Sequence, residues 1–255
     1  MSERSAPTGY LPTNTLLKAL FAFLLIFVVL DIGGIVNQIL DLAIISRAIA
    51  GQPATEAEVQ GSATRAAGWM GINALMLISA AVVFLTLVGR LNHNARILGA
   101  ERLSQTPGFA VGCYFIPIAN IWLPYQGMQE IWKVAMHGPE KWKRGDGSTL
   151  VGVWWLLRIG SVVIDRVVLT MARSNDLSVL QSSCYVAMIV MVSQIILCYL
   201  TWRVFSGACQ LMDAQSLNAS IGQGTCPQCG ESVKDFLMDC PMCGAAVNKT
   251  AGVTL

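Results

Sequence analysis

Four long runs of apolar residues alternate with polar segments and predict helices that cross a membrane. A helix needs about 20 apolar residues to span the hydrocarbon core of a bilayer. Runs of this kind cover residues 16–39, 69–89, 150–172 and 180–205. We therefore expect an all-α integral membrane protein whose four transmembrane helices lie within residues 16–205.

The polar segments predict the ends of these helices and the connections between them. Residues 1–15 carry two prolines and predict a disordered N-terminus. Residues 51–65 join the first two runs, and Thr55 and Glu58 have the spacing of a capping box that begins a helix. Residues 206–225 are mainly polar and predict a linker to the cysteine-rich tail.

Residues 108–136 are apolar and aromatic, but prolines interrupt them. Pro117 and Pro124 both lie in the stretch FIPIANIWLPYQ. After Pro124, apolar and polar positions recur with helical spacing, which predicts an amphipathic helix with Pro124 in its first turn. A proline removes a backbone hydrogen bond that hydrocarbon cannot replace. We expect this segment to be re-entrant or interfacial, without crossing the membrane.

The positions of Lys and Arg favour the same topology, because basic residues concentrate in cytosolic loops. With the tail in the cytosol, four crossings place ten basic residues of the loops and N-terminus inside and three outside. A crossing by residues 108–123 would change these numbers to seven and six. We therefore expect both termini to be cytosolic. The three outside are Arg47, Arg65 and Arg173, and the ten inside are Arg4, Lys18, Arg90, Arg96, Arg102, Lys133, Lys141, Lys143, Arg144 and Arg203.

The overall composition agrees with a membrane protein. Hydrophobic residues make up 54% of the chain and charged residues only 13%, whereas soluble domains carry about 25% charged residues. The net charge of +2 does not indicate binding to nucleic acid.

The tail, CPQCGESVKDFLMDCPMCG, contains two C-P-x-C-G motifs and predicts a zinc ribbon over residues 226–246. Four thiolates suit a tetrahedral, structural Zn²⁺ site with no open position for catalysis. Iron bound by the same thiolates, or two disulfides, are the alternatives; a cytosolic tail disfavours disulfides. The predicted ligands are Cys226, Cys229, Cys240 and Cys243.

The string PGFAVGCYFIPIANIWLPYQGMQEIW, preceded by NHNARILGAE, resembles the bacterial DUF4328 family of membrane proteins. The resemblance extends over residues 15–205, and its most specific part is residues 92–132. Cys113 and Tyr114 depart from the family pattern, which has aromatic residues there. The resemblance implies a bacterial inner-membrane location and assigns no activity. The motif residues are Pro117, Asn120, Trp122, Pro124, Tyr125, Glu130 and Trp132.

Charged residues inside the predicted spans are costly and usually face a bundle interior. Asp31 lies in the first span, and Arg158, Asp165 and Arg166 lie in the third. They predict either a polar pathway or ligand site, or an Asp–Arg bridge that fixes the packing of the helices.

These features favour a non-enzymatic membrane protein whose zinc ribbon acts as a scaffold, a sensor or a module that binds a cytosolic protein. No catalytic motif is recognisable; an enzyme using His93 is the least favoured alternative. A small transporter or channel, with its path along the charged third span, is the main alternative. The expected partners are the lipid bilayer, a cytosolic protein and, as an open alternative, a second copy of the chain.

Overall fold

The computed structural model describes residues 7–221, 223–230, 232–234 and 239–246. The elements within these residues are helices and a short antiparallel hairpin, in which Gly224 pairs with Val233, and an isolated β-bridge joins Asp239 to Ala246. The elements are α1 (Asn14–Ile49), α2 (Glu56–Ile97), α3 (Pro107–Gly112), the 3₁₀ turn η1 (Cys113–Phe115), α4 (Ala119–His137), α5 (Thr149–Met171), α6 (Leu177–Ile221), β1 (Gln223–Thr225) and β2 (Ser232–Lys234).

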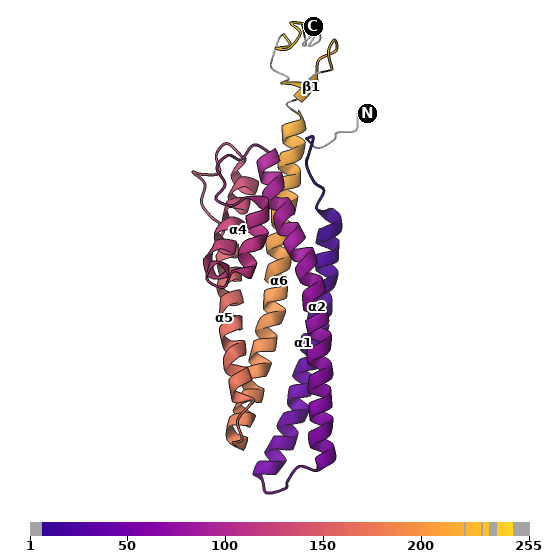
Figure 1. The fold of residues 1–255 in the computed structure, drawn as a ribbon, viewed down its shortest axis with the longest axis vertical. Coiled ribbons are helices and arrows are strands. Elements are labelled where there is room, and N and C mark those ends of the chain that lie inside the picture. Colours follow the sequence, from indigo (N-terminus) through magenta and orange to yellow (C-terminus); the bar gives the residue numbers. More distant parts are fainter. Residues whose placement is uncertain (1–6, 222, 231, 235–238, 247–255) are drawn as a thin grey trace, which may run out of the picture.

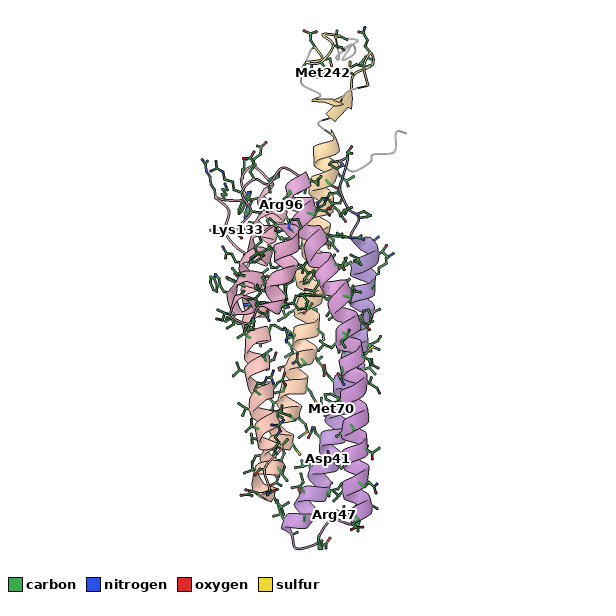
Figure 2. The ribbon with its side chains drawn as sticks, viewed as in Figure 1. Asp41, Arg47, Met70, Arg96, Lys133 and Met242 are labelled. Carbon is green, nitrogen blue, oxygen red and sulfur yellow. The ribbon has the colours of Figure 1, made fainter. Side chains whose placement is uncertain are left out.

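Four helices run along the length of an elongated bundle, and the shorter α3 and α4 lie toward one end of it (Figure 1). Helix α6 packs against α1 and α5, and α1 also packs against α2. The start of α1 and the β-hairpin lie at the same end of the bundle (Figure 1). Figure 2 places Arg96 and Lys133 toward this end, and Asp41 and Arg47 toward the opposite end. We call the end with the hairpin the ribbon end.

Three helices are long and apolar enough to cross a membrane, which fits the predicted helical membrane protein. They are α1, α2 and α6, the last of these over Leu177–Leu217. Large apolar side chains such as Val29, Leu75 and Ile189 are exposed along them, as helices in contact with lipid require. Helix α5 is not among the three, because every window of 18 residues within it contains Arg158, Asp165 and Arg166.

The predicted capping box is present at the start of α2. The Thr55 N–H donates to Glu58 Oε2 at 2.9 Å, and the Glu58 N–H donates to Thr55 Oγ1 at 3.3 Å. These bonds satisfy two backbone donors that a helix start leaves without partners. Glu58 also pairs with Arg47 at the end of α1, so the connector joins two helix ends.

The prediction of a polar linker over residues 206–225 was wrong for most of its length. Helix α6 continues to Ile221, and β1 begins at Gln223. Ala208, Met212 and Ser216 recur at helical spacing and are at most 3% exposed. This narrow buried stripe is enough to maintain the helix, although the segment is polar overall.

The prediction of a disordered N-terminus was also wrong for the part that the structure describes; residues 1–6 lie outside it. The Tyr10 hydroxyl donates to Asp213 Oδ1 at 2.6 Å. The Leu11 N–H donates to Asn94 Oδ1 at 2.9 Å, and Asn94 Nδ2 donates to the Leu11 carbonyl at 2.8 Å. The segment before α1 is thereby attached to α2 and α6. Burial, assisted by the Asp213 carboxylate, raises the pKa of Tyr10 above its usual range.

Candidate metal centre and aromatic motif

The four tail cysteines lie together with the geometry of a metal site. Their sulfur atoms are all within 4.8 Å of one another. Cys226 Sγ lies 3.5 Å from Cys243 Sγ, and Cys229 Sγ lies 3.7 Å from Cys240 Sγ. A tetrahedron built with Zn–S bonds of ~2.3 Å has edges of about 3.8 Å. The four sulfurs therefore fit a tetrahedral metal ion, and all four cysteines are free of disulfide bonds.

The two halves of this centre have the same backbone geometry. The Gly230 N–H donates to the Cys226 carbonyl at 2.9 Å, and the Gly244 N–H donates to the Cys240 carbonyl at 2.8 Å. Both glycines are left-handed, with φ of 72° and 71°. A side chain would strain this conformation, which explains why glycine follows the second cysteine of each motif.

The surrounding backbone favours the thiolate that a metal requires. Hydrogen bonds from the backbone N–H groups of Cys229 and Gln228 lower the pKa of Cys226 to about 6. The backbone N–H of Ala245 acts in the same direction on Cys243, but the neighbouring cysteine side chains outweigh it and raise the pKa of Cys243. Cys226 and Cys240 are buried, whereas Cys229 and Cys243 are exposed. Four protein ligands complete a tetrahedral shell, so the centre suits a structural role. The sulfur geometry does not distinguish zinc from iron.

The aromatic motif begins differently from the prediction. Helix α4 starts at Ala119, where the Asn120 N–H donates to the Ile116 carbonyl at 2.8 Å, and Pro124 lies inside the helix. Pro117 is exposed in the preceding turn. Pro124 cannot donate to the Asn120 carbonyl one turn earlier, and side chains from other segments bond two carbonyls close to it. Trp155 Nε1 donates to the Ile121 carbonyl at 2.8 Å, and Gln105 Nε2 donates to the Leu123 carbonyl at 2.6 Å.

The remaining motif residues anchor α4 to its neighbours. Glu130 Oε2 accepts a hydrogen bond from the Ser104 N–H at 2.9 Å. The Trp132 ring is 8% exposed and lies against Gly207, where an added Cβ would come within 2.7 Å of the ring. The rings of Trp122 and Tyr125 lie 5.2 Å apart, and Trp122 is 61% exposed. Most of the motif therefore has a packing role, and Pro117 and Trp122 are the motif residues left at the surface.

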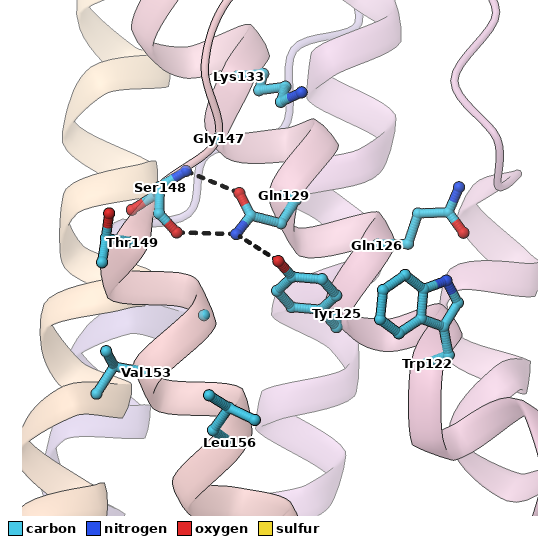
Figure 3. A pocket seen from close by; sticks show the side chains of 11 residues that line it. Trp122, Tyr125, Gln126, Gln129, Lys133, Gly147, Ser148, Thr149, Val153 and Leu156 are labelled. Atoms are coloured by element: carbon cyan, nitrogen blue, oxygen red, sulfur yellow. Dashed lines mark hydrogen bonds between the residues drawn. The ribbon is translucent and has the colours of Figure 1, made fainter.

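A surface hollow of about 610 Å³ lies between α4 and the start of α5 (Figure 3). Trp122 and Tyr125 line it, together with Gln129, Lys133 and Ser148, which the motif did not include. In the sequence, Gln129 and Lys133 could be identified by their positions on the polar face of the amphipathic helix predicted after Pro124. No sequence signal indicated Ser148, because only the fold brings the start of α5 to α4.

The charged residues of the predicted spans do not form the Asp–Arg bridge that was one of the predicted alternatives. Asp31 is 8% exposed, whereas Arg158, Asp165 and Arg166 lie at the surface of α5. Within the described part of the chain, the ion pairs are Arg47–Glu58 and Arg65–Asp41. Asp31 and Asp165 are close enough to interact electrostatically. Arg158 and Arg166 interact electrostatically with Asp165, but no ion pair joins these four residues within the part of the chain that the structure describes.

The helices and the cysteine centre define the class: a helical membrane protein with a candidate metal site on its C-terminal tail. The chain belongs to a family described as a domain of unknown function (DUF4328), whose model matches residues 51–209. The matched segment includes the aromatic motif and ends before the four cysteines. The comparisons with curated proteins and with solved structures found no match.

Proposed function

We propose that this chain is a non-enzymatic multi-pass protein of the bacterial inner membrane. Its helical domain holds a zinc ribbon in the cytosol, and the ribbon binds a cytosolic protein. The observation that carries the proposal is the direct connection of the two parts. Helix α6 runs from the bundle to Ile221, and β1 of the ribbon begins at Gln223. A ribbon attached in this way stays close to the membrane surface.

In this proposal α5 is the fourth span. Its 23 residues extend over about 35 Å, which exceeds the ~30 Å of a hydrocarbon core. It runs beside α6 along the bundle (Figure 1). Arg166 lies near the end of α5 at Met171 and is long enough to direct its charge toward headgroups. An even number of crossings agrees with the start of α1 and the ribbon lying at the same end.

The basic residues support a cytosolic ribbon end. Arg96 and Lys133 lie toward this end, and Arg47 lies toward the other (Figure 2). Thiolates also remain reduced and available for a metal in the cytosol. Zinc is the metal proposed, because two closely spaced cysteine pairs with no open ligand position are typical of structural zinc.

Metal analysis of the purified full chain tests the ribbon. We expect about one zinc per chain, and we expect Cys226→Ser with Cys240→Ser to remove it. Met242→Ala is the matched control, since Met242 lies in the second motif, is 74% exposed and supplies no ligand. Iron in the wild-type protein would refute the choice of zinc. Zinc retained by the double variant would refute the site.

Recovery of a partner tests the proposed role. Proteins crosslinked to the full chain in cells should be fewer after the double cysteine substitution, because loss of metal unfolds the ribbon. Cys198→Ser, in the membrane half of α6, is the control for loss of a thiol outside the ribbon. An identical set of crosslinked proteins from wild type and double variant would contradict the role.

Transport is the second candidate, and the burial of Asp31 favours it. A carboxylate that is 8% exposed in the middle of α1 is costly in a membrane, so it is often functional. We expect Asp31→Asn to reduce ion or proton flux in liposomes if this candidate holds. Asp146→Asn, in an exposed loop, should leave flux unchanged. Absence of flux from the wild-type protein would exclude transport of the ions tested.

A further inference from the structure

The hollow between α4 and α5 has polar groups at one end and apolar groups at the other. Lys133, Gln129 and Ser148 lie on the side of the ribbon end, and Val153 and Leu156 lie farther along α5 (Figure 3). The other lining residues are Trp122, Tyr125, Gln126, Gly147, Thr149 and Gly152. This order matches the order of polarity across one leaflet of a membrane.

The wall at the polar end is held by a pair of hydrogen bonds. The Ser148 N–H donates to Gln129 Oε1, and Gln129 Nε2 donates to the Ser148 carbonyl, each at 2.8 Å. A Cβ added to Gly147 would lie 2.7 Å from Gln129 Oε1 and 3.6 Å from Lys133 Cε. Glycine thus allows the loop to approach α4 closely and brings the Lys133 side chain alongside the start of α5.

Lys133 is the charged group that lines the hollow, and it has no ion pair within the part of the chain that the structure describes. The nearby start of α5 has no side-chain cap, so its first backbone N–H groups add positive potential. The loop between α4 and α5 contributes Lys141, Lys143 and Arg144 against Glu140 and Asp146. The polar end therefore attracts an anion.

The apolar end is exposed to the surroundings of the bundle. Leu156 is 74% exposed, Val153 44% and Trp122 61%. Ile118, next to the start of α4, is 85% exposed. Apolar side chains with this exposure are expected to contact acyl chains, and tryptophan favours the interface between headgroups and hydrocarbon. The hollow therefore lies where a phospholipid crosses from its headgroup to its chains.

We propose that this hollow binds an anionic glycerophospholipid of the membrane. Its phosphate pairs with Lys133 beside the start of α5, and one acyl chain lies along Val153 and Leu156 against Trp122. The inference requires that the helices lie in a bilayer, but it does not depend on the metal or the partner of the ribbon. A failure of the ribbon experiments would leave it standing, and its own failure would leave the ribbon's role intact.

Lipid retention by the full chain tests the charge at the polar end. Protein purified in mild detergent is incubated with equal amounts of phosphatidylglycerol and phosphatidylcholine, and bound lipid is measured by native mass spectrometry. Wild type should retain phosphatidylglycerol preferentially. Lys133→Gln should lower that retention about five-fold, as expected for loss of one basic residue near a lipid surface. Lys18→Gln is the control, because Lys18 is exposed near the start of α1, away from the hollow.

Filling the hollow with a larger side chain tests whether its apolar end binds an acyl chain. Gly152 lines the hollow and Gly160 does not, although both lie on α5 and a Cβ added to either would meet no atom within 4 Å. Gly152→Leu should therefore reduce retention without disturbing the fold, whereas Gly160→Leu should not reduce it. Thermal unfolding of each variant in detergent shows whether the fold is intact.

Several results would overturn the proposal. Equal retention of both lipids by wild type would exclude selection of the anionic headgroup. Retention by Lys133→Gln or Gly152→Leu within two-fold of wild type would exclude the hollow. Displacement of the bound lipid by inorganic phosphate at equal concentration would identify a soluble phosphate as the ligand instead.

Discussion

At the level of single residues, Gly127 shows how tightly the aromatic motif is packed. A Cβ added to Gly127 would lie 2.5 Å from Gln105 Oε1, and Gln105 Nε2 bonds the Leu123 carbonyl beside Pro124. The glycine therefore allows a side chain from another segment to support the helix next to its proline. No feature of the sequence alone connects Gln105 with Gly127.

Gly127→Ala should destabilise the protein by about 1–3 kcal/mol, because the new methyl group displaces Gln105 from a packed site. The midpoint of thermal unfolding in detergent measures this effect. Gly112→Ala is the matched control, since a Cβ added at Gly112 in the same region would meet nothing within 4 Å. Equal stability of the Gly127 variant and wild type would contradict the packing described.

Tyr10 predicts a dependence of stability on alkaline pH. Burial and the bond to Asp213 raise its pKa in the folded state, so the folded protein keeps this proton when the unfolded chain loses it. Tyrosine in the unfolded chain has a pKa of about 10. The contribution of Tyr10 to the free energy of unfolding is complete below that pH and falls as the pH rises above it. Unfolding of wild type should therefore become easier above about pH 10.

In Tyr10→Phe this alkaline loss should be weaker, while stability near pH 7 falls by about 1 kcal/mol because the Asp213 hydrogen bond is lost. Denaturation measured at pH 7 and above pH 10 provides the comparison. Tyr185→Phe, at a site that is 50% exposed, is the control. An identical alkaline response in wild type and Tyr10→Phe would show that this tyrosine is not responsible.

At the level of secondary-structure elements, local sequence patterns determine where some helices begin or end, and tertiary contacts determine this for others. The start of α2 follows from a capping box that the sequence displays. The end of α6 depends on a buried stripe through Ala208, Met212 and Ser216. In α4, Gln105 and Trp155 donate to the Leu123 and Ile121 carbonyls, so side chains from other segments support the helix just before Pro124.

Thr55→Ala should weaken the start of α2 by about 1 kcal/mol, because the Glu58 N–H loses its acceptor. Hydrogen exchange should become faster in the first turn of α2 and stay unchanged near its centre. Thr64→Ala is the control, because the Thr64 hydroxyl bonds the Gln60 carbonyl inside the same helix and caps nothing. Unchanged exchange in the first turn would contradict the role of the cap.

Removal of the metal should affect the ribbon selectively. A chelator should make the tail after Ile221 sensitive to protease and leave the helical circular dichroism nearly unchanged, because metal binding supplies the folding energy of so small a unit. Added zinc should restore resistance. Equal resistance with and without metal would show that the ribbon folds by itself.

At the level of the whole molecule, the orientation of α5 decides the topology. If α5 crosses the membrane, the loop after it lies on the opposite side from the loop before it. A maleimide that cannot cross membranes should then label Ser174→Cys in intact cells and should not label Lys141→Cys. Both positions lie in the loops that flank α5, where Lys141 is exposed and Ser174 is partly exposed. Labelling of both or neither from outside would rule out a fourth span.

The sequence was sufficient for features that depend on neighbouring residues or on composition. Long apolar runs indicated membrane helices because their length must match the bilayer. The spacing of Thr55 and Glu58 indicated a helix start, and two C-P-x-C-G motifs indicated a metal site. In each case the residues that interact are close in the chain, or their chemistry limits what they can bind.

Only the tertiary structure decided features that join distant segments. It attached Tyr10 to Asp213, extended α6 beyond its apolar run and placed Lys133 beside the start of α5. It also left Arg158 and Asp165 without the bridge that their spacing suggested. The physical reason is that burial and hydrogen bonding depend on which helix faces are neighbours. The periodicity of the sequence identifies the polar face of a helix, but the packing of the other helices determines which residues that face contacts.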